Sequence, residues 1–314
     1  TAYQHLVLAV GARNRVLAIE GAGLAGVHAL RTLDDATALH QHLQSSRRVV
    51  VIGAGFIGLE VAAVAAKLGA EVTVLDVADR AMARAVSAPI SRIFAAAHRA
   101  AGVHLHFDVA IKRLVGEAGQ VCAVETAGGE RIAADLVLVG IGVQPNVEIA
   151  AASGLAVANG IVVDAQMLTA DPAISALGDC AAHPNPFADG TSIRLESVQN
   201  ASDQARVVAA RLSGKPHDYS SVPWFWSDQG ELKLQIAGLT AGHDRTVVRG
   251  DASSCTVFCY RGERLLGIET VNRPGDHMAA RKLMALQFAG KIALSPEQAA
   301  DEGVDLKQMV AAAT

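Results

Sequence analysis

Cysteine is scarce in this sequence, long apolar runs are missing, and neither sign of charge is concentrated. The 314 residues include four cysteines, too few and too scattered for a disulfide framework or for a metal site built from paired CxxC motifs. No segment approaches the roughly 20 apolar residues of a membrane-spanning helix, and the opening residues lack the basic stretch of a signal peptide. The 27 basic and 31 acidic residues form no basic block, which argues against nucleic-acid binding. We therefore expect a soluble, cytoplasmic protein with no membrane or nucleic-acid partner.

The composition that is present favours a globular chain. With 51% hydrophobic residues, it can build two or three domains with sizeable cores. Cys255 and Cys259 share one face of the predicted strand CTVFC, which favours a buried pair of small apolar side chains over a redox pair. His104 and His106 share a strand face in GVHLHFD, with no third ligand nearby at metal spacing. This pattern favours a solvated strand over a metal site, so no metal is predicted.

Two stretches, GAGLAG at residues 21–26 and GAGFIG at residues 53–58, fit the glycine pattern of a dinucleotide-binding loop. Such a loop needs a buried strand before it, a helix opening on its third glycine, and a second strand that ends in an acid about 20 residues later. The second stretch has all three. The first runs into a helix-like segment and then Arg47 and Arg48, without a second strand or an acid. We expect residues 21–26 to form a connecting loop.

Each glycine of the second stretch has a predicted task. Gly53 permits the tight turn, Gly55 lets the backbone approach a pyrophosphate, and Gly58 allows the helix to pack closely on the strand. The preceding RVVVI is typical of a parallel strand covered on both faces. Gly69 ends the predicted helix, whose apolar residues recur at helical spacing. Those residues are Ile57, Val61, Val64 and Leu68.

Asp76 ends the next predicted strand, EVTVLD. A carboxylate at this place can accept hydrogen bonds from both hydroxyls of an adenine ribose and disfavours a 2′-phosphate. The sequence therefore predicts NADH rather than NADPH as the nucleotide. A glycine-rich turn without a ligand is the alternative.

A partial repeat indicates a second dinucleotide domain. HLVLAVGARNR, from His5, and DLVLVGIGVQPN, from Asp135, each read as an apolar strand, a glycine and polar turn residues. Gly11 and Gly142 are the glycines of these two copies, and both are predicted cofactor contacts. The spacing predicts that residues 1–16 are the closing strand of a first dinucleotide domain whose glycine loop is absent from the sequence. Asp179, in ISALGDCAAHP, follows an apolar strand, where a carboxylate can meet a ligand at the sheet edge.

Several segments together resemble a known family. They are LVLAVGA, VVVIGAGFIGLEVAAVAAKLGAEVTVLD, GIGVQPN, ISALGDCAAHPNP, IRLESVQNASDQAR, VPWFWSDQGELKLQIAGL and TVNRPGDHMAARKLM. In this order, and over essentially the whole chain, they resemble the FAD-dependent ferredoxin reductases of the putidaredoxin reductase and rhodocoxin reductase type. These reductases lie within the pyridine nucleotide-disulfide oxidoreductase superfamily. The PWFWSDQ stretch separates them from related disulfide reductases.

The resemblance implies an α/β fold with two Rossmann-like dinucleotide-binding domains and a carboxyl-terminal α+β domain. Residues 1–26 and 147–219 would form a split, incomplete FAD-binding domain. Residues 27–146 would form the NADH-binding domain, and residues 220–314 the carboxyl-terminal domain. Because the amino-terminal FAD glycine loop has no counterpart here, we expect this chain to bind FAD weakly and to show little activity.

The resemblance also assigns roles to individual residues. Glu60 would lie near the nicotinamide, Asp179 would bind the ribityl or phosphate region of FAD, and Trp226 would lie beside the isoalloxazine ring. Residues 196–200 would approach the flavin, with Glu196, Ser197 and Val198 as the predicted contacts. Without the resemblance, Glu60 would be interpreted as a first-turn acid favoured by the helix dipole, and residues 224–226 as core or interface aromatics.

The implied activity is that of an NADH-dependent ferredoxin reductase, an enzyme that passes electrons from NADH through FAD to a [2Fe-2S] ferredoxin of a monooxygenase or dioxygenase system. Its expected oligomeric state is monomer or dimer. Two alternatives remain open at this point. One is a non-enzymatic, NADH-binding remnant, and the other is a related flavoprotein NADH oxidase or disulfide reductase.

Overall fold

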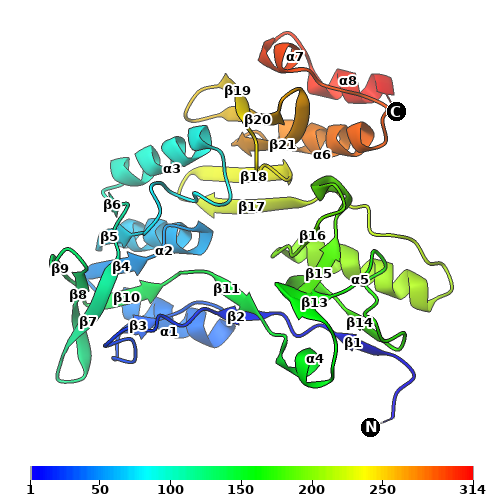
Figure 1. The fold of residues 1–314 in the computed structure, drawn as a ribbon. Helices are drawn as coiled ribbons and strands as arrows, with labels where there is room; N and C mark the ends of the chain where they lie inside the picture. The colour runs from blue at the N-terminus through cyan, green and yellow to red at the C-terminus, as the bar shows by residue number, and fades with distance from the viewer. Residues whose placement is uncertain (1, 314) are drawn as a thin grey trace.

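The computed structural model describes residues 2–313, which form three lobes (Figure 1). The Rossmann lobe spans residues 27–139, and the split lobe combines residues 2–14 with residues 143–219. The carboxyl-terminal lobe begins at residue 224. Within the described residues, no helix is long and apolar enough to cross a membrane.

The Rossmann lobe is built on a five-stranded parallel sheet with the order β3-β10-β4-β5-β6. Its strands are β3 (Val27–His28), β4 (Arg48–Ile52), β5 (Glu71–Leu75), β6 (His104–His106) and β10 (Leu136–Val139), and its helices are α1 (Leu33–Leu43), α2 (Phe56–Lys67) and α3 (Ala88–Ala100). A three-stranded meander, β7 (Ile111–Glu117), β8 (Gln120–Thr126) and β9 (Arg131–Ala133), is inserted before β10.

Both faces of this sheet are covered, which explains why β4 has no polar interruption. Val49 and Val51 face the core made with α1, α2 and α3, while Val50 and Ile52 face a core shared with the meander. The prediction of a strand buried on two sides is therefore confirmed. Fully burying one such side chain stabilises the fold by about 1.5–3 kcal/mol. At the edge of the sheet, His104 and His106 are exposed on β6, as the solvated-strand interpretation expects.

Helix α2 forms where the sequence predicts it, and Gly69, at φ +88°, follows its end in the left-handed conformation. The apolar residues whose spacing predicted this helix do not form its buried face, because Ile57, Val64 and Leu68 are about half exposed. The buried face instead uses small residues beside Leu59 and Val61. These small residues are Gly58, Ala62 and Ala65. Small side chains are needed where the helix packs closely on the strand, and hydrophobic periodicity alone does not predict this requirement.

The stretch GAGLAG forms turns rather than the start of a helix, which confirms the prediction of a connecting loop. It lies along the meander. The amide of Ala25 donates to the carbonyl of Gly119 at 3.1 Å, and the amide of Leu114 donates to the carbonyl of Glu20 at 2.9 Å. A Cβ built at Gly21, whose φ is +84°, would collide with the backbone of Leu114. This glycine serves local packing.

The split lobe is assembled from chain segments far apart in sequence. β1 (Leu6–Leu8) pairs in parallel with β14 (Ile174–Ala176), and β2 (Ala12–Asn14) pairs with β11 (Val143–Pro145). The remaining elements are β12 (Val157–Ala158), β13 (Gly160–Val162), β15 (Ala181–Pro184), β16 (Ser192–Ile193), α4 (Glu148–Ala152), α5 (Val198–Leu212) and two short 3-10 helices, η1 (Gly178–Cys180) and η2 (Pro186–Ala188).

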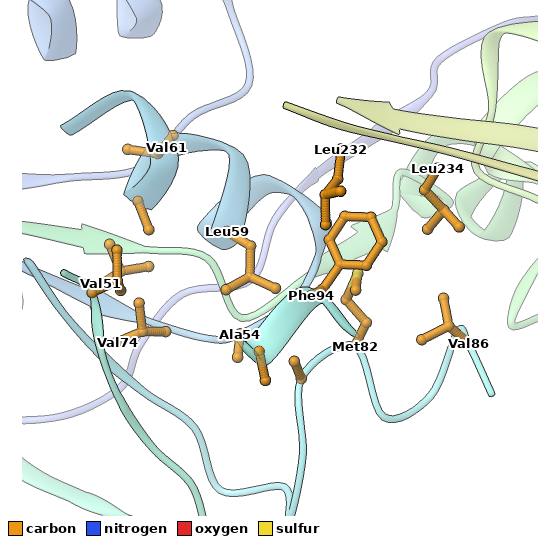
Figure 2. Close-up of a cluster of buried hydrophobic side chains, with 14 of the residues drawn as sticks. Val51, Ala54, Leu59, Val61, Val74, Met82, Val86, Phe94, Leu232 and Leu234 are labelled. Atoms are coloured by element: carbon orange, nitrogen blue, oxygen red, sulfur yellow. The ribbon is translucent and has the colours of Figure 1, made fainter. Parts of the chain in front are cut away.

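The carboxyl-terminal lobe is a five-stranded antiparallel sheet covered by helices. Its strand order is β17 (Trp224–Gln229), β18 (Leu232–Gly238), β21 (Arg264–Val271), β20 (Cys255–Arg261) and β19 (Arg245–Gly250), followed in sequence by α6 (Pro274–Phe288), α7 (Pro296–Ala300) and α8 (Leu306–Ala313). One face packs on α6 and α8, and the other joins the core of the Rossmann lobe. Figure 2 shows Leu232 and Leu234 beside Phe94 and Met82. Cys255 and Cys259 are buried thiols in this shared core, as the buried-pair interpretation expects.

Candidate active site

The glycine loop GAGFIG lies at the carboxyl end of β4, beside the loop that follows β10. Gly53 has φ +108°, and a Cβ there would lie 2.3 Å from the carbonyl oxygen of Gly140. A Cβ at Gly58 would lie 2.0 Å from the carbonyl oxygen of Gly53, so helix and turn are in direct contact. Gly55 differs from both. It is the N-cap residue of α2, and among the described residues no heavy atom beyond its chain neighbours lies within 4 Å of a Cβ built there.

This geometry matches the requirements of a dinucleotide loop. Gly53 and Gly58 are required by the protein's own packing, whereas Gly55 borders open space at a helix amino terminus. Helix amino termini present unpaired N–H groups that bind phosphate. β4 lies between β5 and β10 at the point where strand order reverses, and nucleotides bind at that switch point in such sheets.

Asp76 lies directly after β5 and reaches back to the glycine loop. Its two carboxylate oxygens accept hydrogen bonds from the amides of Ala54, at 2.5 Å, and Ala78, at 2.7 Å. The side chain is half-buried. Each carboxylate oxygen has a second lone pair, so the group can hold the loop and still accept from a ribose hydroxyl.

Glu60 lies in the first turns of α2 and contacts the carboxyl-terminal lobe. The Ser227 hydroxyl, on β17, donates to Glu60 Oε1 at 2.6 Å. Partial burial raises the pKa of Glu60 above its ordinary value, the hydrogen bond from Ser227 opposes that rise, and the nearby charge of Asp228 adds to it. A half-buried carboxylate is thus held at the junction of two lobes.

Strand β17 places its aromatic residues between two helices. It contacts α2 of the Rossmann lobe and α5 of the split lobe. The Phe225 ring lies 4.5 Å from Phe56 between centroids, while Trp226 keeps 39% of its surface exposed next to Trp224. An exposed tryptophan at such a junction is available to stack on a planar ligand.

Asp179 is part of a second polar cluster, on the split lobe. Arg31, just before α1, pairs with the Asp179 carboxylate at 3.0 Å, and a Cβ at Gly11 would lie 3.7 Å from the same guanidinium. Arg194 donates to the carbonyl of Asp179 at 3.0 Å and pairs with Glu196 at 2.6 Å. The structure therefore brings Gly11, Asp179 and Glu196 into one region.

Helix α5 begins at this cluster. The Ser197 hydroxyl accepts from the amide of Asn200 at 3.1 Å, and Val198 is 64% exposed in the first turn. The carbonyl of Gly142, a residue with φ +94°, accepts from the amide of Arg15 at 3.0 Å, next to the antiparallel pair of β2 and β11. Gly142 belongs to the loop that follows β10.

Several residues of the site were not predicted from the sequence. Ser227 and Gln229 are 1% and 4% exposed on β17, and the only available sign was their alternation within the aromatic WFWSDQ strand. Arg31 was also missed. It precedes the capping box of α1, formed by Thr32 and Asp35, which explains its local position but not its pairing with Asp179.

Comparison with known proteins places this geometry in a family. The family model described as pyridine nucleotide-disulphide oxidoreductase matches residues 1–205, and a reductase C-terminal model matches residues 224–310. The chain belongs to the pyridine nucleotide-disulphide oxidoreductase family. The family resemblance identified from the sequence is thereby confirmed, as is the fold of two dinucleotide-binding lobes with an added carboxyl-terminal domain.

Similar proteins of this family agree over nearly the whole chain. Rhodocoxin reductase of Rhodococcus erythropolis is 54% identical over 311 residues, which are 98% of this chain and 72% of that protein. A solved ferredoxin reductase for the CYP199A2 system of Rhodopseudomonas palustris is 51% identical, with a TM-score of 0.95 over 99% of this chain and 76% of the other. The reductase chain of the covalent putidaredoxin reductase–putidaredoxin complex is 40% identical, with a TM-score of 0.93 over 99% and 75% of the two chains.

Proposed function

We propose that this protein is an NADH-dependent ferredoxin reductase, which passes electrons from NADH through FAD to a [2Fe-2S] ferredoxin of a monooxygenase or dioxygenase system. The observation that carries the proposal is the position of β17. Its Ser227 donates to Glu60 of the glycine-loop helix, and the same strand contacts α5, whose start is linked through Arg194 to Asp179. A nucleotide on the Rossmann lobe and a flavin on the split lobe would meet at this strand.

The relatives support the same activity. They are named as a rhodocoxin reductase and as a ferredoxin reductase for the CYP199A2 system, and one reductase was solved in covalent complex with putidaredoxin. As a member of the pyridine nucleotide-disulphide oxidoreductase family, this chain is an oxidoreductase that uses FAD and NAD(H). That the electron acceptor is a [2Fe-2S] ferredoxin is part of our proposal.

The residues of the Rossmann lobe fit NADH. The open space at Gly55 and the start of α2 would receive the pyrophosphate, while Asp76 would accept from the adenine ribose. Gly142, on the loop after β10, would border the other half of the nucleotide. A 2′-phosphate would bring negative charge against the Asp76 carboxylate, which favours NADH over NADPH.

Glu60 would act on the nicotinamide itself. The nicotinamide ring gains positive charge as its hydride leaves, and a fixed carboxylate beside it stabilises that charge. Because Glu60 is partly buried against β17, its charge is screened less than it would be in water. The carboxylate must be ionised for this task. We expect hydride donation to weaken as the pH falls through its pKa.

The residues of the split lobe fit FAD. Arg31 and Asp179 offer a donor and an acceptor to the phosphate and ribityl groups, and the amino terminus of α5, with Glu196, Ser197 and Val198, would face the flavin ring. Trp226 would stack beside that ring. Gly11, at φ +63°, lies next to Arg31 and would contact the cofactor there. Bound FAD supplies a centre that accepts two electrons together and releases them singly.

We also propose that the three functional domains follow the division predicted from the sequence, with residues 1–26 and 147–219 for FAD, residues 27–146 for NADH, and residues 220–314 as the carboxyl-terminal domain. One detail of packing favours a small change. Leu17, Ile19 and Leu24 pack on the meander of the Rossmann lobe, which favours a boundary near residue 16.

The decisive experiment follows the electrons in protein that carries FAD. We expect NADH to reduce the flavin in a stopped-flow spectrometer, and added [2Fe-2S] ferredoxin then to accelerate reduction of cytochrome c. Glu60→Gln keeps the size of the side chain and removes its charge, so it should slow flavin reduction by about 10- to 100-fold, the scale of one charge-assisted interaction. NADH affinity should change less, because the charge is needed as the hydride leaves.

Two results would contradict the proposal. Rapid NADH oxidation by oxygen without any acceleration by a ferredoxin would favour an oxidase. NADH binding without flavin reduction, in protein with a full complement of FAD, would favour a non-enzymatic role.

A further inference from the structure

Four polar side chains from three elements form one continuous chain of hydrogen bonds that ends at Glu60. His98 Nε2, on α3, lies 2.9 Å from Gln229 Oε1 on β17. Gln229 Nε2 lies 3.0 Å from Ser227 Oγ, and Ser227 Oγ lies 2.6 Å from Glu60 Oε1. His98 and Gln229 are each 4% exposed and Ser227 is 1% exposed, so water does not replace these bonds.

The chemistry of the groups fixes the direction of every bond. An ionised Glu60 only accepts, so the single hydroxyl proton of Ser227 points to it. Ser227 Oγ must then accept from the amide nitrogen of Gln229, whose carbonyl oxygen is left to accept from His98 Nε2–H. The second N–H of the Gln229 amide points to the sulfur of Met82, with 3.5 Å between Gln229 Nε2 and Met82 Sδ. All three donors point toward Glu60.

We propose that Ser227 and Gln229 are positioning residues that hold the Glu60 carboxylate in one orientation beside the nicotinamide site. This inference rests on the role proposed above for Glu60. The carboxyl-terminal lobe would thereby contribute to the hydride-transfer site through β17, with two buried residues that act through Glu60.

The charged surroundings of Glu60 show why it needs such a partner. Burial raises its pKa, and the charge of Asp228, exposed on the same β17, raises it further. The hydrogen bond from Ser227 works against both effects. His98, on α3, stands at the other end of this series of hydrogen bonds. Burial lowers the pKa of His98, so it is a neutral donor rather than a second charge. Without Ser227, Glu60 would bind a proton at higher pH.

The test measures the ionisation of Glu60 separately from turnover. In protein without NADH, infrared difference spectra between the unmodified protein and Glu60→Gln give the midpoint at which Glu60 ionises. We expect Ser227→Ala to move this midpoint upward by about one to two pH units, the scale of one hydrogen bond to a charged group. The pH at which NADH-dependent flavin reduction reaches half its maximum should move by the same amount.

Two matched variants separate positioning from damage to the fold. Ser227→Thr keeps the hydroxyl and should restore a midpoint near that of the unmodified protein. Asp228→Asn removes the neighbouring charge on the same strand and should move the midpoint in the opposite direction, downward. In the Glu60→Gln background, Ser227→Ala should change the rate of flavin reduction by less than about twofold, because the charge that Ser227 stabilises is already absent.

The outcomes distinguish this inference from the proposed function. If Glu60→Gln leaves flavin reduction unchanged, the role of Glu60 at the nicotinamide is wrong. If Glu60→Gln slows it but folded Ser227→Ala leaves both midpoint and rate unchanged, only the positioning role is overturned. Nitrogen NMR of His98 in the unmodified protein provides a check without any substitution. A neutral ring protonated on Nε2 is expected, and a proton on Nδ1 instead would overturn the direction of the chain.

Discussion

A single carboxylate, Asp76, joins the glycine loop to the strand beside it. By accepting from the amides of Ala54 and Ala78, it fixes the turn that would receive the pyrophosphate and faces the expected position of the ribose. One residue thus supports both the shape of the loop and the choice of nucleotide. The sequence motif anticipates the second task, and the structure adds the first.

Asp76→Ala should therefore weaken NADH binding more than NADPH binding. A hydrogen bond to a charged group is worth about 1.5–3 kcal/mol, so we expect NADH affinity to fall by roughly 10- to 100-fold and the preference over NADPH to narrow. Fluorescence titration with both nucleotides measures the difference. Asp79→Asn, an exposed change of the same charge three residues later, is the control and should leave both affinities unaltered. Equal affinity of the unmodified protein for the two nucleotides would show that Asp76 does not discriminate between NADH and NADPH.

At this scale, the sequence could predict residues whose role is local and could not predict residues defined by a distant partner. Gly53, Gly58 and Asp76 lie in one continuous motif, so spacing is enough to name them. Ser227 acquires its role from Glu60, which is remote in sequence, and Arg31 acquires its place from Asp179. No local pattern encodes such pairings.

The two glycine loops have the same sequence pattern but lie in different structural elements. In the loop after β4, Gly55 begins a helix beside open space, whereas Gly23 lies in a turn on the meander, with space around it as well. Neither glycine has a positive φ, so alanine fits the backbone at both positions. What separates them is whether a ligand occupies the space.

Gly55→Ala should abolish tight NADH binding while the protein stays folded. The added methyl group meets no described side chain but enters the space needed by the pyrophosphate, so we expect at least a tenfold loss of affinity and a loss of stability of no more than about 1 kcal/mol. Gly23→Ala should change NADH affinity by less than about twofold. Calorimetric titration and urea unfolding of both variants provide the comparison. Equal losses of affinity would mean that residues 21–26 also contribute to nucleotide binding.

Helix α2 marks the limit of prediction for a whole element. Its existence and its end at Gly69 follow from alanine-rich sequence and a left-handed glycine, both of which are local. Its orientation does not, because Gly58 and Ala62 are selected by how closely the helix approaches β4. The residue sizes that fit at this contact depend on both α2 and β4, and the sequence of the helix alone does not show which strand it packs against.

Across the whole molecule, the carboxyl-terminal sheet and the Rossmann lobe share one hydrophobic core, and a buried polar contact crosses it. Glu269, on β21, accepts from the backbone amide of Ser87 at 2.9 Å and from the Ser87 hydroxyl. Ser87 is the N-cap residue of α3. The carboxylate from one lobe therefore caps a helix of the other, where the helix dipole favours negative charge. The sequence indicated three domains, but this interlock could not be predicted from it.

This contact predicts a pH dependence of stability. Burial raises the pKa of Glu269 above its unfolded value, and the hydrogen bonds from Ser87 oppose that rise. The protonated form is thus favoured in the folded state, so the stability associated with Glu269 is fully present below the unfolded pKa and is lost as the pH rises through the folded pKa. Glu269→Gln keeps the shape of the side chain without the charge. The free energy of unfolding of this variant, relative to that of the unmodified protein, should therefore increase as the pH rises from 5 to 8.

Ser87→Ala tests the same interlock from the other lobe. It leaves a fully buried carboxylate without its hydroxyl donor, so we expect a loss of about 1–3 kcal/mol in the free energy of unfolding, larger at pH 8, where Glu269 is more ionised, than at pH 5. Urea unfolding followed by tryptophan fluorescence measures it, because Trp224 and Trp226 lie in the same sheet as Glu269. In the Glu269→Gln background the loss should shrink and its pH dependence disappear, while Glu263→Gln, at an exposed turn, should change stability by less than about 0.5 kcal/mol. A loss from Ser87→Ala that is the same at both pH values and persists beside Glu269→Gln would mean that Ser87 stabilises α3 alone and does not join the two lobes.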